Sequence, residues 1–173
     1  MIDRRRFRDL MAGVCAPVTV VTTLHDGCPH GSTVSSFTSL SLDPPLVSVA
    51  FDRKSTLLPR ILETGRFGVN VLGHAQHELA TTFARRGVDR FAGTGWYLDA
   101  DLPRLPEAAG WMACDLHRVV PGGDHLLLFG LVLVSGRSDR PPLVYAHRTF
   151  GTHSRFAERP RVKVADAIAA CAR

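Results

Sequence analysis

Two long β-strand patterns, at residues 111–120 and 124–135, are separated only by the turn sequence Pro121-Gly122-Gly123. Such a short connection joins antiparallel strands, because a parallel crossover needs a dozen or more residues. The second pattern is apolar at nearly every position, whereas an antiparallel strand normally has one solvent-facing side. We therefore expect one face of this strand to fill a core and the other to meet a helix or a second subunit.

Most other strand patterns also follow one another through turns. Segments rich in β-branched or alternating apolar residues predict strands at 18–23, 32–37, 46–51, 67–72 and 143–147. The sequence His25-Asp26-Gly27 predicts a hairpin turn between the first two. Helical spacing or capping residues predict helices at 3–13, 55–62, 74–86 and 159–172, and one turn near Glu107. We therefore expect a mainly β fold with flanking helices, an antiparallel β-barrel with the helices packed outside.

The composition is that of an ordinary folded chain. With 173 residues, of which 45% are hydrophobic and 21% charged, we expect one domain over residues 1–173. The longest apolar run, 126–134, is too short to cross a bilayer, and no apolar stretch follows the charged N-terminus. These features predict a cytoplasmic protein without a membrane partner.

The formal net charge of +5 is compatible with nucleic acid, a membrane surface or an anionic small molecule. The basic residues are scattered, however, and the densest cluster is Arg4-Arg5-Arg6, without a basic helical face or interleaved aromatic residues. We therefore expect no nucleic-acid partner, and an anionic small molecule remains.

The four cysteines contain no CxxC pair, so we expect free thiols and neither a zinc site nor a disulfide framework. His25, Cys28 and His30 lie close together in the sequence but surround the turn residues of a hairpin. A polar hairpin tip explains them better than a metal site does, and we expect no metal.

Serine and threonine make up most of the segment from Gly31 to Ser41. Hydroxyl groups beside free backbone N–H groups can bind an anion or a sugar phosphate, because they donate several hydrogen bonds without a fixed charge. A surface strand whose hydroxyl groups face water would explain the same pattern.

A second polar cluster, Asp52-Arg53-Lys54-Ser55-Thr56, precedes the helix predicted at 55–62. The unpaired N–H groups and partial positive charge of a helix N-terminus favour a phosphate there. Simple capping by Ser55 or Thr56 is the alternative. The presence of both polar clusters in one chain favours a bound phosphorylated ligand.

Other candidate residues are less specific. His125 begins the most apolar strand and could orient a substrate or transfer a proton, although a structural histidine fits as well. Phe83, Tyr145 and Phe150 could line a pocket for a planar ligand, or belong to the core. The chain has no Gly-x-Ser-x-Gly, GxGxxG or P-loop motif, which leaves no nucleophile elbow, Rossmann cradle or P-loop.

The order of motifs resembles the flavin reductase-like family, whose members have an FMN-binding split barrel and serve two-component flavin-dependent monooxygenases. The resemblance spans residues 7–151 and leaves out a C-terminal tail at 154–173. It rests on Phe7-Arg8-x-x-Met11, Val18–Thr23, Gly31–Val47, Lys54-Ser55-Thr56, Phe67–Leu72, Gln76–Ala84, Gly123-Asp124-His125 and Gly130-x-Val132.

The resemblance implies a site for flavin near the interface of a homodimer. It implies that His125 positions the nicotinamide. It also implies that the flavin is bound by Thr33, Ser35, Ser36, Phe37, Ala50, Phe51, Lys54, Ser55, Thr56, Phe83, Ala84, Tyr145 and Phe150.

The implied activity is an NAD(P)H:flavin oxidoreductase that transfers a hydride from NADH or NADPH to FMN or FAD and supplies a partner monooxygenase. The cofactors perform this chemistry, which explains why no nucleophile motif is needed. Two alternatives stay open: a split-barrel flavoprotein that retains its flavin and reduces a small organic substrate, and a flavin- or haem-binding protein without turnover.

Overall fold

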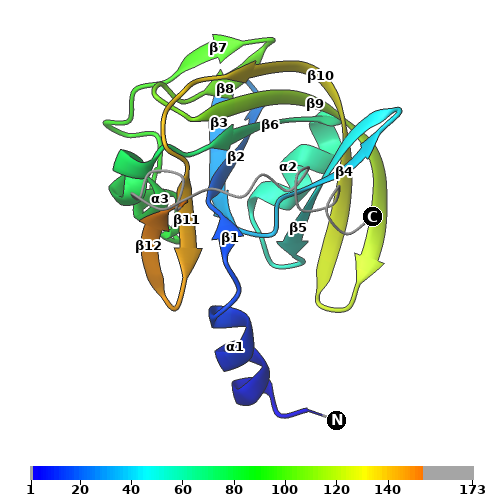
Figure 1. The fold of residues 1–173 in the computed structure, drawn as a ribbon. Coiled ribbons are helices and arrows are strands. Elements are labelled where there is room, and N and C mark those ends of the chain that lie inside the picture. Colours follow the sequence, from blue (N-terminus) through cyan, green and yellow to red (C-terminus); the bar gives the residue numbers. More distant parts are fainter. Residues whose placement is uncertain (1, 154–173) are drawn as a thin grey trace, which may run out of the picture.

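The computed structural model describes residues 2–153, which form a large curled antiparallel sheet with helices around it (Figure 1). The sheet has seven strands in the order β3-β2-β6-β9-β10-β5-β4. They are β2 (Thr19–His25), β3 (Cys28–Val34), β4 (Thr38–Leu42), β5 (Pro45–Asp52), β6 (Arg66–Val71), β9 (Gly110–Gly122) and β10 (His125–Arg137). The edge strands β3 and β4 do not pair with each other, so the barrel is split. The predicted fold class is confirmed.

The longest strands, β9 and β10, form the predicted hairpin and curve along the sheet (Figure 1). β10 also pairs with β5, which places His125 opposite Asp52 at the end of the ladder. Packing explains why residue 130 of β10 is a glycine, because a Cβ atom there would lie 2.4 Å from Cζ of Phe67. The glycine therefore lets β10 pass closely over the core.

Two small sheets complete the described strands. β1 (Ala16–Pro17), β11 (Leu143–Ala146) and β12 (Thr149–Thr152) form one, and β7 (Tyr97–Asp99) and β8 (Leu102–Arg104) form the other. β12 was not predicted. The β7–β8 hairpin was not predicted either, because residues 87–109 lack a clear apolar period. The helical turn predicted near Glu107 is wrong. Glu107 lies in a turn with a φ of 62°, which a right-handed helix does not allow.

The helices match the predicted positions within a few residues. They are α1 (Arg4–Ala12), α2 (Leu57–Thr64), the 3-10 turn η1 (His74–Gln76) and α3 (His77–Ala84). Gly65 ends α2 in the left-handed conformation, as its position after the helix predicts. The helix predicted at 159–172 lies outside the described residues. No helix between residues 2 and 153 combines the length and apolarity needed to span a membrane.

The sheet carries apolar clusters on both faces. Val21, Phe67 and Leu128 pack with Ile61 of α2 in one cluster, while Val20 packs with Phe83 of α3 in another. Since successive residues of a strand point to opposite faces, both sides of β2 are buried. This packing anchors α2 and α3 on the sheet. It thereby fixes the positions of the N-terminus of α2 and the C-terminus of α3.

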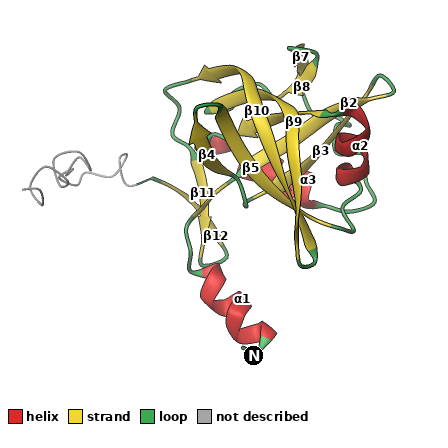
Figure 2. Ribbon diagram, turned by 90° about the vertical axis from the view of Figure 1, so that its right-hand side faces the viewer, coloured by secondary structure: helices red, strands yellow, loops and turns green. Residues whose placement is uncertain are grey.

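Several large apolar side chains are exposed among residues 2–153. The far end of β10 exposes Leu133 (51%) and Val134 (42%), and α1 exposes Phe7 and Leu10. Helix α1 buries none of its residues and projects from the sheet (Figures 1 and 2). The start of β10 fills the core as predicted, since Leu128 is fully buried.

Candidate functional site

A cavity of about 580 Å³ opens where β3, β5 and the start of α2 meet the end of α3. Its volume is within the range of small-molecule sites. The lining consists mainly of hydroxyl, basic and small residues: Ser32, Thr33, Val34, Ser35, Ser36, Ala50, Phe51, Asp52, Lys54, Ser55, Thr56, Ala84, Arg86, Gly87, Arg90 and His125. The hydroxyl-rich segment and the basic helix start therefore face one cavity, which we call the primary cavity.

Hydroxyl groups build one wall of the primary cavity. The Ser36 hydroxyl donates to the carbonyl oxygen of Ala50 and accepts from its backbone nitrogen, both at 2.9 Å. The Thr33 hydroxyl donates to the carbonyl oxygen of Ala80 in α3 at 2.6 Å. These bonds fix the wall to β5 and to α3, and the hydroxyl oxygens keep acceptor capacity toward a ligand.

The turn between β5 and α2 forms the opposite wall. The Asp52 carboxylate accepts from the backbone nitrogen of Lys54 at 2.8 Å, and the Asp52 carbonyl accepts from that of Ser55 at 2.8 Å. The Ser55 hydroxyl accepts from the backbone nitrogen of Leu57 at 3.3 Å, whereas Thr56 makes no side-chain capping bond. The predicted capping role thus belongs to Ser55, and the turn holds Lys54 at the cavity.

The primary cavity is cationic. Besides Lys54, it is lined by Arg86 and Arg90. Neither Lys54 nor Arg86 has a carboxylate partner within residues 2–153, so both charges are available to an anion. Burial, and the charge of Arg86 after it, hold the pKa of Arg90 below its usual value. A guanidinium remains protonated in proteins, so Arg90 still carries its charge.

Sequence reasoning missed both arginines. Arg90 donates from Nη1 to the Gly31 carbonyl at 2.6 Å and from Nε to the Arg85 carbonyl at 2.7 Å. These bonds bring a segment without secondary structure back onto β3. The one available signal was the sequence Arg85-Arg86-Gly87 at the end of the helix predicted at 74–86.

His125 lies at the β5–β10 end of the primary cavity, with its side chain 44% exposed. Its Nδ1 lies 2.8 Å from the Asp124 carboxylate. The hydrogen bond from His125, followed by its charge, holds the pKa of Asp124 below its usual value. A bond of this kind orients the ring and leaves Nε2 toward solvent or a ligand.

Four predicted site residues do not line the primary cavity. Phe37 packs against the core cluster of the sheet. Phe83 is fully buried below Gly31, where a Cβ atom would lie 2.8 Å from the Phe83 ring. Tyr145 and Phe150 pair with each other in the β11–β12 hairpin, with ring centroids 5.2 Å apart. None of these four rings lines the primary cavity, and their contact with a flavin stays a prediction.

The remaining groups do not suggest metal or thiol chemistry. Among residues 2–153, no set of three histidine, cysteine or carboxylate side chains is placed to hold a metal ion. Cys15 and Cys28 are exposed free thiols and Cys114 is buried. Burial, with a smaller effect of Asp115, raises the pKa of Cys114 to about 12, so this thiol stays protonated near neutral pH.

A split antiparallel barrel with a cationic, hydroxyl-lined cavity defines a β-rich domain suited to a phosphorylated ligand. The family described as "Flavin reductase like domain" matches residues 11–154, and the chain belongs to this family. The predicted resemblance is confirmed.

Individual relatives agree with this assignment. The chain is 37% identical over 154 residues to a probable flavin reductase of Rhizobium meliloti, covering 88% of this chain but half of the relative. It is 40% identical over 148 residues to the reductase subunit HsaB of a flavin-dependent monooxygenase of Rhodococcus jostii, covering 83% and 75% of the two chains. The solved structure of a Streptomyces globisporus NADH:FAD oxidoreductase with NAD and FAD fragments superposes with a TM-score of 0.84, at 31% identity and 90% and 96% coverage.

Proposed function

We propose that the protein is an NAD(P)H:flavin oxidoreductase that transfers a hydride from a nicotinamide cofactor to FMN or FAD. One observation carries the proposal: the segment 32–36 and the turn 52–56 line the same cationic cavity. Family membership supplies the class of ligand, and the related reductase of known cofactors, which acts on NADH and FAD, supports the same pairing.

The residues of the primary cavity fit a flavin nucleotide. Lys54 and Arg86 provide unpaired positive charge for its phosphate, next to the start of α2. Ser35, Ser36 and the backbone around them provide hydrogen-bonding groups for the polyol chain and the edge of the ring. Ala50 and Ala84 leave room beside them for a flat ring, since their side chains are small.

The chemistry of such a site is hydride transfer, which a bound flavin supplies as acceptor and a nicotinamide as donor. The chain's contribution is positioning, because two rings must be held face to face at reacting distance. The half-exposed side chain of His125, which lines the cavity, would orient the nicotinamide. No nucleophile is required.

The assay is the consumption of NADH or NADPH by the purified protein, followed at 340 nm with FMN, with FAD and without added flavin. The proposal predicts consumption that depends on flavin and saturates with added flavin as a substrate. Turnover that needs an organic acceptor and ignores added flavin would indicate a flavoprotein that retains its flavin. No consumption under any combination would contradict the proposal.

We also propose that two copies of the chain associate. Leu133 and Val134 on β10, together with Phe7 and Leu10 on α1, expose apolar surface that a second copy would bury. Light scattering after size exclusion should give twice the chain mass. Leu133→Lys should shift the distribution toward monomer, and a wild-type protein that stays monomeric at assay concentration would contradict the dimer.

The reduced flavin would be delivered to a partner monooxygenase, because the Rhodococcus jostii relative is named as the reductase subunit of a flavin-dependent monooxygenase. Coupled assays with candidate oxygenases test this delivery. Product formation that depends on this reductase, on flavin and on NAD(P)H together supports it.

A further inference from the structure

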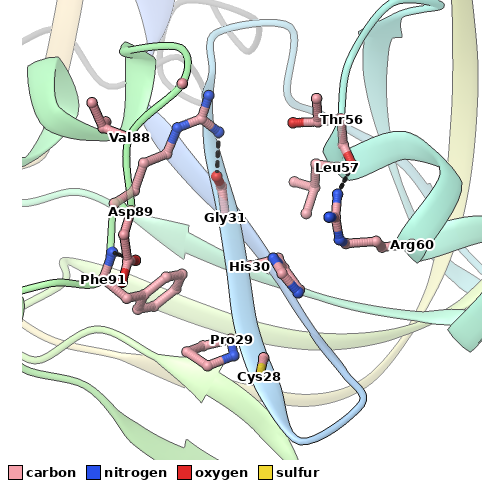
Figure 3. A pocket seen from close by; sticks show the side chains of 12 residues that line it. Cys28, Pro29, His30, Gly31, Thr56, Leu57, Arg60, Val88, Asp89 and Phe91 are labelled. Atoms are coloured by element: carbon pink, nitrogen blue, oxygen red, sulfur yellow. Dashed lines mark hydrogen bonds between the residues drawn. The ribbon is translucent and has the colours of Figure 1, made fainter.

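A second cavity of about 500 Å³ adjoins the primary cavity (Figure 3). Strand β3 forms its floor from Cys28 to Gly31, Arg60 of α2 lies on one side, and the loop with Val88 lies on the other. We call it the β3 cavity. Thr56, Gly87 and Arg90 line both cavities, so the two share one boundary.

The shared boundary is cationic and held in place by backbone bonds. Arg60 donates from Nη1 to the carbonyl oxygen of Thr56, one turn earlier in the chain. Arg90 uses Nε and Nη1 on two backbone carbonyls, which leaves Nη2 available. Two guanidinium groups thus flank the point where the cavities meet, which is suited to a phosphate group.

The β3 cavity beyond this boundary is suited to a planar heterocycle. Pro29, Val88 and Phe91 give it apolar surface, and His30 and Asp89 give it polar groups. Burial, followed by the charges of Arg60 and His25, holds the pKa of His30 below its usual value. His30 is therefore a neutral imidazole near pH 7, able to donate one hydrogen bond and accept another.

We propose that the β3 cavity binds the adenylyl half of FAD, with the pyrophosphate crossing the shared boundary between Thr56 and Arg90. This inference rests on the proposed function, since it assumes that the riboflavin phosphate half occupies the primary cavity. The cavities meet beside the turn 54–56, where the flavin phosphate is expected, and a dinucleotide continues from that phosphate. The adenylate of NAD(P)H is a less suitable occupant, because the nicotinamide is expected at the far end, beside His125.

Equilibrium dialysis with FMN and with FAD tests the inference. The wild type should bind FAD more tightly than FMN. Arg60→Ala should weaken FAD binding about tenfold, the usual effect of losing one hydrogen bond to a charged group, and leave FMN binding unchanged. Val88→Glu places a negative charge in the β3 cavity, so it should also weaken FAD binding and leave FMN binding unchanged. Arg137→Ala is the matched control, since Arg137 is an exposed arginine of β10 outside both cavities.

A second measurement uses Cys28, an exposed thiol that lines the β3 cavity. FAD should slow alkylation of Cys28 and FMN should not, while the exposed Cys15 serves as internal reference. Equal protection by both flavins, or equal loss of FMN and FAD affinity in Arg60→Ala, overturns the inference. So does a raised KM for NADH in Arg60→Ala with unchanged FAD binding, which would assign the cavity to the nicotinamide cofactor. Failure to bind either flavin overturns the proposed function as well, so the two failures are distinguishable.

Discussion

The Ser36 hydroxyl oxygen lies 2.9 Å from both the backbone nitrogen and the carbonyl oxygen of Ala50. One side chain therefore ties the hydroxyl-rich segment 31–41 to β5, two residues before Asp52 begins the turn toward Lys54. Because of this tie, two polar clusters that are separate in the sequence face the same cavity.

Replacing Ser36 by alanine should weaken flavin binding about tenfold. The change removes one donated and one accepted hydrogen bond, each worth about 0.5–1.5 kcal/mol, and frees the wall of the cavity from β5. Flavin dissociation constants from fluorescence titration measure the effect. Ser39→Ala, on exposed β4 outside the cavity, should bind flavin as the wild type does, and equal behaviour of the two variants would remove Ser36 from the site.

Lys54→Ala should weaken FMN binding about tenfold but leave riboflavin binding nearly unchanged, since riboflavin lacks the phosphate. The affinity of the wild type for FMN should also fall with salt, and the variant should show a weaker salt dependence. Titrations of both ligands at two ionic strengths supply the comparison. Parallel losses for FMN and riboflavin would show that Lys54 does not contact the phosphate.

His125→Ala should raise the KM for NAD(P)H severalfold, about the effect of one lost contact, with little change in the dissociation constant for flavin. The half-exposed ring lies at the end of the primary cavity and is oriented by Asp124. Steady-state kinetics with each substrate varied in turn separate the two effects. Kinetics identical to those of the wild type would exclude His125 from the nicotinamide site.

Gly31→Ala should lower the free energy of unfolding by about 1–3 kcal/mol, the usual effect of overpacking. Its Cβ atom would lie 2.8 Å from the Phe83 ring and 3.3 Å from Phe91, both of which are buried. Urea unfolding followed by circular dichroism is the measurement. The control is Gly151→Ala, where a Cβ atom meets nothing within 4 Å, and an equal loss there would refute the packing argument.

His30 predicts a pH dependence of stability. Burial lowers its pKa in the folded protein, so the unfolded chain binds more protons as the pH falls through the usual histidine value. The free energy of unfolding should therefore decrease from pH 7.5 to 5.5, and less so in His30→Gln. Urea unfolding of both proteins at the two pH values decides this, and an identical decrease would contradict the role given to His30.

The pairing of neighbouring strands was predictable from local sequence. Turn residues such as Asp26-Gly27 and Gly122-Gly123 join strands that pair directly, so period and turn chemistry are enough. That Ser36 and Lys54 line one cavity could be predicted only from the family resemblance. The number of residues between them does not indicate which loop faces which turn.

Long-range contacts set the limit of prediction. Arg90 reaches the cavity through bonds to the carbonyl oxygens of Gly31 and Arg85, and no apolar period marks the segment that carries it. The resemblance implied that Tyr145 and Phe150 contact the flavin, and the sequence did not indicate that β11 pairs with β1 and β12 in a sheet separate from the one that lines the primary cavity. The type of a side chain indicated the chemistry it could perform, whereas the pairing of the strands determined its position relative to the cavity.

The most direct measurement of the central claim is a crystal structure of the protein with FMN. The account predicts the phosphate beside Lys54 and Thr56, with the ring and its polyol chain against Ser35, Ser36 and Ala50. Well-defined FMN bound elsewhere, with the primary cavity holding only solvent, would contradict it.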